Sequence, residues 1–169
     1  RSEAAPIDEE LKALAAEVFA NYEKQMDKFQ FSNALNEVFR LLDRANKYID
    51  ETTPWILAKT EENKPRLGTV MYVLAECIRA IAVYIQPTMP STPARIYAQL
   101  GVTDPALMRW ESVQTFGQLK PGTVVKKGEA LFPRVDVKKE LEDMAAEKDK
   151  EAKKAEKAAK KEDKKAEKK

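Results

Sequence analysis

Side chains that could recognise a ligand gather in one short stretch near the middle of the sequence. Asp43, Asn46 and Asp50 follow the spacing i, i+3, i+7, which places them along one edge of a helix. Pro54 and Trp55 follow shortly after them. Carboxylates and amides hydrogen-bond polar groups, and an indole held at a corner can stack on a flat ring. Residues of these types at a corner could therefore hold an unstacked nucleic-acid base.

Spacing alone leaves two interpretations of this stretch open. In the first, Trp55 is a core residue beneath a loop and the two aspartates are surface charges. In the second, the corner holds the indole partly exposed, as a platform for a base. In both, Asn46 lies near the apolar side of its helix. We therefore expect its amide to bond to the backbone of the Thr-Thr-Pro corner and to brace that corner.

Composition argues against catalysis within this chain. Histidine is absent, which removes the commonest general base, the usual metal ligand and every Ser-His or Cys-His nucleophile. The 5 glycines form no phosphate-binding loop. The single cysteine, Cys77, lies in an apolar run, so we expect a buried core residue and a reducing, cytoplasmic compartment. We predict no catalytic residue, metal site or cofactor in this chain.

Charge is unevenly distributed along the 169 residues. The chain carries +2 overall, but residues 137–169 contain 13 Lys against 10 Asp and Glu, so residues 1–136 carry −1. A body of this charge would bind nucleic acid through particular side chains and not through a general positive field. Arg40, Arg44 and Lys47 could contact phosphates, although a solvated helix face is the commoner role for such residues.

The elements that must hold the corner are predicted to be helices. Asp8 caps a first helix, whose apolar face is formed by Leu11, Leu14, Val18, Phe19, Tyr22, Met26 and Phe29. Ser32 caps a second helix, and Pro54 ends it because the residue before a proline avoids the helical conformation. The predicted core stripe of this second helix consists of Leu35, Val38, Leu42, Ala45 and Ile49, with Phe39 at its edge.

A third helix is predicted to begin at Pro65 and to run to about Gln86, where Pro87 stops it. It contains the longest apolar run of the chain, which is about as long as a membrane span. Glu76 and Arg79 interrupt the centre of that run. We therefore interpret this segment as a buried helix of a bundle.

After this helix, a shorter helix is predicted over residues 91–101, followed by one further turn that leads to Trp110. We expect Trp110 to be a core or domain-contact residue. Beyond it, β-branched residues alternate with Pro-Gly and Lys-Gly turns, the pattern of a small hairpin. The chain ends in Lys, Glu, Asp and Ala without an apolar face, which indicates a fraying helix or a disordered linker. The predicted divisions are a helical bundle at 1–118, a β-hairpin ending in LFPR at 119–136 and a charged tail at 137–169.

Three segments of this sequence resemble a known family when they are taken in order. They read NKYIDETTPWILAKTEE, LAECIRAIAVYIQPTMPSTPARIYAQLG and WESVQTFGQLKPGTVVKKGEALFPR. Together they resemble the C-terminal anticodon-binding domain of bacterial methionyl-tRNA synthetases (methionine–tRNA ligases), over about residues 8 to 136. A lone Asn-x-Tyr would carry no information, whereas three segments in this order and spacing make chance similarity implausible.

The resemblance implies roles for the residues at the corner. In that family the tryptophan of the Pro-Trp corner stacks on the anticodon and helps to select its first base, cytosine. This role is expected of Trp55, with Pro54 fixing the corner. Asp43 and Asp50 resemble carboxylates that disfavour wrong anticodons, because a fixed negative charge weakens binding unless the correct bases compensate. Asn46 resembles the family asparagine that supports this arrangement.

The resemblance covers only part of such an enzyme. The family has an upstream helix with an Asn-x-x-x-Arg pair that contacts the anticodon, and catalytic HIGH and KMSKS motifs, and none of these is found in this sequence. We therefore expect a fragment whose parent binds ATP in an absent catalytic domain. The expected partners are the initiator and elongator methionine tRNAs and that catalytic domain, with no membrane and no DNA.

These observations predict an all-α bundle of about four helices with a small C-terminal β-hairpin. The predicted function is recognition of the CAU anticodon of tRNA, as the non-catalytic module of a methionine–tRNA ligase used in translation. The alternative is a non-catalytic helical protein-interaction module whose lysine-rich tail gives non-specific RNA binding.

Overall fold

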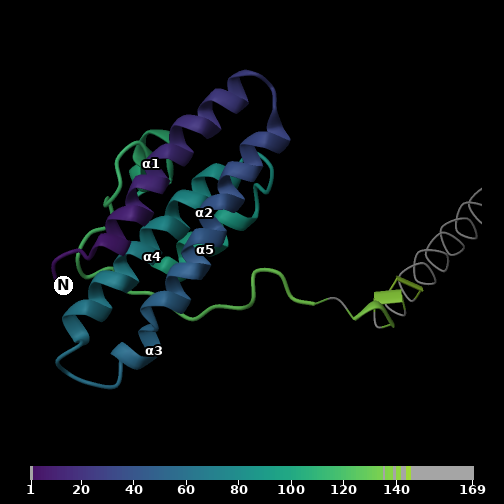
Figure 1. The fold of residues 1–169 in the computed structure, drawn as a ribbon. Coiled ribbons are helices and arrows are strands. Elements are labelled where there is room, and N and C mark those ends of the chain that lie inside the picture. The colour runs from purple at the N-terminus through teal and green to yellow at the C-terminus, as the bar shows by residue number, and fades with distance from the viewer. Residues whose placement is uncertain (1, 135, 139, 142–143, 146–169) are drawn as a thin grey trace, which may run out of the picture. The chain divides into compact units, whose positions relative to one another are not determined.

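The computed structural model describes residues 2–134, 136–138, 140–141 and 144–145, and the chain divides into two compact units, Arg1–Leu131 and Phe132–Lys169. The first unit is helical (Figure 1). Its elements are α1 (Pro6–Asp27), α2 (Phe31–Thr52), α3 (Pro54–Leu57), α4 (Lys64–Ile85), α5 (Thr92–Leu100) and two 3-10 helices, η1 (Pro105–Met108) and η2 (Trp110–Val113). The predicted helical bundle is confirmed, because α1, α2, α4 and α5 are its four longer helices.

The first two helices begin slightly earlier than the sequence predicted. α1 starts at Pro6, whose fixed backbone angle suits the first helical position, and Asp8 lies inside the first turn and is not the cap. The Asp8 carboxylate accepts a hydrogen bond from the Ala5 N–H at 2.7 Å, so it still satisfies an unpaired donor at the helix start. α2 begins at Phe31, which places Ser32 within the helix.

The buried face of α2 is rotated relative to the predicted core stripe. Its buried residues are Ala34, Val38, Leu41, Ala45 and Tyr48. Val38 and Ala45 are therefore confirmed as core residues, whereas Leu35, Leu42 and Ile49 are only partly buried. α2 packs mainly against α1 and also against α4, so the arc that faces both neighbours decides which side chains are buried. This rotation turns the edge that carries Asn46 toward solvent.

α4 is the central helix and packs against α1, α2, α3 and α5 (Figure 1). Its length and composition would suit a membrane span, but 67% of its most apolar window is buried inside the protein. Cys77 has no exposed surface, which confirms it as a core residue. Glu76 and Arg79 are also buried, and they pair with each other. The interpretation of α4 as a buried bundle helix is confirmed.

The predicted β-hairpin is wrong, because residues 117–134 contain no strand. The backbone of this segment bonds to α5 and not to a second strand. The Lys126 N–H donates to the Gln99 carbonyl at 2.7 Å, and the Arg95 guanidinium donates to the carbonyls of Ala130 and Leu131, each at 2.8 Å. These groups therefore pair with α5 and not with a second strand.

The segment at 117–134 passes so close to the end of α5 that only glycine fits there. Gly101 has a left-handed backbone (φ 71°), and a Cβ at this position would collide with the carbonyl oxygen of Val124.

The second unit is described only in part. Its described residues at 137–138, 140–141 and 144–145 have helical backbone, and the Glu140 N–H donates to the Asp136 carbonyl at 3.0 Å. The rest of the predicted charged tail at 137–169 lies outside the described residues.

Candidate nucleic-acid interface

The corner between α2 and α3 turns sharply within one residue. Thr53 has a left-handed backbone (φ 43°, ψ 60°), and its N–H donates to the Ile49 carbonyl at 2.9 Å as the last bond of α2. The Thr53 carbonyl then accepts from the Ile56 N–H at 2.8 Å, and Pro54 occupies the first position of α3. The Thr52 hydroxyl donates to the Tyr48 carbonyl at 2.6 Å. Backbone and hydroxyl groups of the corner therefore satisfy one another.

Trp55 lies on the outside of this corner. Its side chain is 54% exposed, and the neighbouring Ile56 is 50% exposed. In α3 it is Leu57 that packs against the core. An interior role for Trp55 is therefore wrong, and about half of this residue is accessible to a ligand that stacks on the indole.

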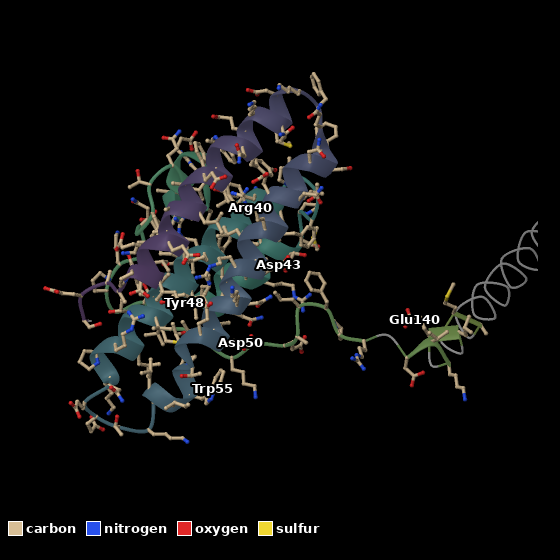
Figure 2. All side chains as sticks on the ribbon, viewed as in Figure 1. Arg40, Asp43, Tyr48, Asp50, Trp55 and Glu140 are labelled. Atoms are coloured by element: carbon tan, nitrogen blue, oxygen red, sulfur yellow. The ribbon has the colours of Figure 1, made fainter. Side chains whose placement is uncertain are left out.

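The two aspartates of the predicted site are exposed on the same helix edge. Figure 2 shows Asp43, Asp50 and Trp55 following one another along α2 and α3. Neither carboxylate forms an ion pair or a hydrogen bond with any described residue. Both negative charges are therefore left without a described partner on the helix edge that leads to Trp55.

The predicted brace by Asn46 is wrong. Asn46 is exposed, and its amide makes no hydrogen bond within the described part of the chain. The corner does not need it, because Thr52 and Thr53 supply the local bonds themselves. The exposed amide keeps both its donor and its acceptor available between the two aspartates.

The three predicted phosphate-contacting residues all have carboxylate partners. Arg40 pairs with Glu17 of α1 at 2.7 Å and with Glu37 at 3.4 Å. Arg44, only 14% exposed, bridges Glu10 of α1 at 2.9 Å and Glu51 at 3.0 Å, and Lys47 lies 3.7 Å from Glu51. The pKa of Arg44 is raised, first by its hydrogen bond to Glu10. These bonds tie α1 to α2, so a phosphate would have to compete with carboxylates already in place.

Sequence reasoning missed a buried cluster at this end of the bundle, formed by Asp8, Tyr48 and Arg66. The Tyr48 hydroxyl donates to Asp8 Oδ1 at 2.6 Å, and the Arg66 guanidinium donates to both carboxylate oxygens, at 2.8 Å to Oδ1. Asp8 and Tyr48 have no exposed surface. The partners lie 40 and 58 residues from Asp8 in the sequence, so no spacing rule joins them. The one available signal was a tyrosine in register with the core stripe of α2.

The charge state of this cluster follows from its hydrogen bonds. Burial by itself would raise the pKa of Asp8, but the hydrogen bonds from Arg66, Tyr48 and Ala5 and the positive charge of Arg66 outweigh burial and lower it from 3.8 to about 2. Burial and the neighbouring Asp8 raise the pKa of Tyr48. At neutral pH the cluster therefore consists of a carboxylate, a guanidinium and a neutral phenol.

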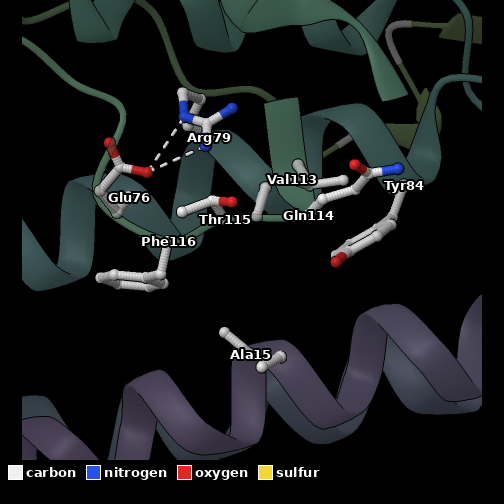
Figure 3. Close-up of a pocket in the computed structure, with 10 residues that line it drawn as sticks. Ala15, Glu76, Arg79, Tyr84, Val113, Gln114, Thr115 and Phe116 are labelled. Atoms are coloured by element: carbon white, nitrogen blue, oxygen red, sulfur yellow. Dashed lines mark hydrogen bonds and ion pairs between the residues drawn. The ribbon is translucent and has the colours of Figure 1, made fainter. Parts of the chain in front are cut away.

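A small cavity lies beside the buried Glu76–Arg79 pair, between α1, α4 and the segment after η2 (Figure 3). It holds about 20 Å³, room for a single water molecule. Arg79 donates to Glu76 Oε2, to the Leu107 carbonyl and to both oxygens of Ser112, at 2.8–3.2 Å. These bonds anchor η1 and η2 to α4, and the cavity has no space for a substrate. Among the described residues no group of three or more His, Cys, Asp or Glu side chains could hold a metal ion.

Trp110, the other tryptophan, belongs to the core. Its ring centroid lies 4.9 Å from Phe19, 5.5 Å from Tyr22 and 5.8 Å from Tyr84. The interpretation of Trp110 as a core residue is confirmed, and Trp55 is the tryptophan that the structure leaves exposed.

Comparisons with known proteins find sequences and structures similar to this chain. Residues 2–154 match the family model described as the anticodon binding domain of methionyl tRNA ligase. The chain is 55% identical to the methionine–tRNA ligase of Caldanaerobacter subterraneus subsp. tengcongensis over 150 residues, which are 87% of this chain and 23% of that protein. It is 47% identical to the Bacillus subtilis enzyme over 135 residues, which are 80% of this chain and 20% of that protein.

A solved structure has a similar fold. The free-state crystal structure of Mycobacterium tuberculosis methionyl-tRNA synthetase matches with a TM-score of 0.72 and 31% sequence identity, over 80% of this chain and 27% of that chain. This chain therefore spans about a quarter of the length of the relatives it resembles.

Proposed function

The chain belongs to the anticodon-binding domain family of methionyl tRNA ligase, and from this premise we propose that it recognises the CAU anticodon of methionine tRNAs during translation. The observation that carries the proposal is the half-exposed indole of Trp55 at the corner after α2, the place where a base could stack on it. The relatives bear the name methionine–tRNA ligase. For the parent of this chain we propose the same ligase reaction in the cytoplasm, with ATP bound outside these residues.

Trp55 provides the attraction in this proposal, and the aspartates provide the discrimination. Stacking on an aromatic face is worth about 1–3 kcal/mol per base and tolerates any base. Asp43 and Asp50 have no cationic partner among the described residues, so they repel a phosphate backbone unless the correct bases form compensating hydrogen bonds. The exposed amide of Asn46, between them, can read the polar edge of a base.

Titration with anticodon stem-loops tests the proposal. The full chain is titrated with a CAU stem-loop and with one whose first anticodon base is changed, and CAU should bind more tightly. Trp55→Ala should weaken CAU binding by about 1–3 kcal/mol, the range for one stacked base. Ile56→Ala is the matched control, since it removes an equally exposed apolar side chain from the same helix. Equal affinity for both stem-loops, or equal binding by Trp55→Ala and the unmodified chain, would contradict the proposal.

The charged tail is expected to contribute affinity without selectivity. Removing residues 137–169, which carry a net +3, should weaken RNA binding and flatten its dependence on salt, because fewer counterions are released. The ratio between CAU and changed anticodons should stay the same, since lysines that meet phosphates carry no base information. If the truncated chain no longer distinguished CAU from changed anticodons, the tail would belong to the recognition surface. The alternative function, a protein-interaction module, is not favoured by the family membership of the chain.

A further inference from the structure

The short helix that presents Trp55, α3, is too short to be stable by itself. α3 contains four residues, none of them buried, and one helical turn is not stable alone. It follows the left-handed Thr53 and packs against α4 with Leu57 against the core, so its direction depends on the Thr53 backbone and on the position of α4. The orientation of the indole must therefore be set by the two longer helices on either side, α2 before the corner and α4 after it.

The cluster of Asp8, Tyr48 and Arg66 joins those two helices at the right place. Tyr48 lies one turn before the end of α2, and its carbonyl accepts the Thr52 hydroxyl at 2.6 Å. Arg66 lies in the first turn of α4, directly after the connection that carries α3. Asp8 of α1 holds both, through the hydrogen bonds from the Tyr48 hydroxyl at 2.6 Å and from the guanidinium.

The chemistry of these bonds suits a positioning role. A guanidinium that donates two bonds to one carboxylate resists rotation as well as separation, which a single contact does not. The carboxylate is fully buried, so water does not compete for it. The Ala5 N–H supplies a further bond to Asp8 Oδ2 at 2.7 Å, which fixes the carboxylate itself.

We infer that Asp8, Tyr48 and Arg66 are positioning residues for the Trp55 corner: they hold the end of α2 and the start of α4 in the register that aims the indole at a base. This inference rests on the proposed anticodon recognition, because it assigns a task to residues that do not touch the ligand. It also separates them from the Glu76–Arg79 cluster, which anchors a different segment of the chain.

Two tyrosine variants of the full chain test the inference. Tyr48→Phe removes the hydroxyl that bonds Asp8. Tyr22→Phe is the matched control, since it removes another buried hydroxyl, which donates to the Tyr84 carbonyl at 2.8 Å and lies beside Trp110. Both variants lose one buried hydrogen bond. Because Tyr48 bonds a carboxylate and Tyr22 a neutral carbonyl, a purely structural role predicts a larger loss of global stability for Tyr48→Phe, but no change confined to the corner.

The first measurement is hydrogen exchange of the hydrogen-bonded backbone amides at the corner, those of Thr53, Ile56, Leu57 and Ala58. Tyr48→Phe should speed exchange there and Tyr22→Phe should not. Equal exchange in the two variants overturns the inference, whatever the binding data show. Arg66→Lys, which keeps the charge but loses the two-pronged contact, repeats the test if Tyr48→Phe does not fold.

The second measurement is affinity for the CAU stem-loop, at a temperature where both variants are folded. Tyr48→Phe should weaken binding about 2- to 10-fold, the range of one net hydrogen bond, and Tyr22→Phe by less. In a Trp55→Ala background the effect of Tyr48→Phe should vanish, because the indole it orients is gone. An undiminished effect in that background overturns the inference. If Trp55→Ala alone does not weaken binding, the proposed function fails, and the exchange measurement still decides whether the cluster positions the corner.

Discussion

Replacing Arg79 with methionine should lower the free energy of unfolding more than replacing an exposed arginine. Arg79 is 1% exposed, and its guanidinium lies 2.9 Å from Glu76. It also donates to the Leu107 carbonyl at 2.9 Å and to the Ser112 hydroxyl at 2.8 Å. Methionine fills a similar volume without a charge, so the change removes the bonds and leaves the packing largely in place.

The expected loss follows from what remains buried. Glu76 would keep one hydrogen bond, from the Leu119 N–H, and lose its only cationic partner among the described residues. Breaking a buried ion pair by removing one partner costs about 3–5 kcal/mol. The stability of a whole domain is about 5–15 kcal/mol, so the free energy of unfolding should fall by a large fraction.

Urea unfolding followed by circular dichroism at pH 7 measures this loss, with linear extrapolation to water. Arg40→Met is the matched control, because Arg40 also pairs with two carboxylates but its side chain is 42% exposed. Exposed pairs of this kind contribute about 0–1 kcal/mol. If Arg79→Met loses no more stability than Arg40→Met while the slope with urea is unchanged, the assignment of Arg79 as the anchor of η1 and η2 is wrong.

Three further outcomes are expected. The lowered pKa of Asp8, from 3.8 to about 2, means that its ionised form stabilises the fold fully above pH 3.8 and that this contribution disappears as the pH falls through 2. The difference in unfolding free energy between the unmodified chain and Asp8→Asn should therefore shrink on acidification, in urea titrations at several pH values, and a constant difference would contradict the pKa. Phe29 is 80% exposed and has a left-handed backbone (φ 57°), so Phe29→Gly should raise the thermal midpoint and gain about 1 kcal/mol, whereas Phe29→Ala should not. Burial first, and the charge of Glu76 second, raise the pKa of the Cys77 thiol to about 12, so Cys77 should resist a disulfide reagent in native buffer and react in urea.

The candidate site was predictable where it depends on local features. Pro54 ends α2 as the sequence indicated, and the spacing of Asp43 and Asp50 places them on one exposed edge. The exposure of Trp55 was not predictable, because spacing does not show which side of a one-turn helix faces α4. The brace by Asn46 was wrong because the core stripe of α2 was drawn about one residue out of register.

The sequence by itself determined the helical bundle, the burial of α4 and Cys77, and the place of the corner, since these follow from apolar periodicity, proline and composition within short windows. Only the tertiary structure decided which polar groups meet. Asp8 finds Tyr48 and Arg66 across 40 and 58 residues, and the segment at 117–134, whose local pattern suggested a hairpin, bonds instead to α5. The physical reason is that a helix satisfies its backbone within four residues, whereas a buried charge or an extended backbone must find its partner on whatever element packing brings beside it.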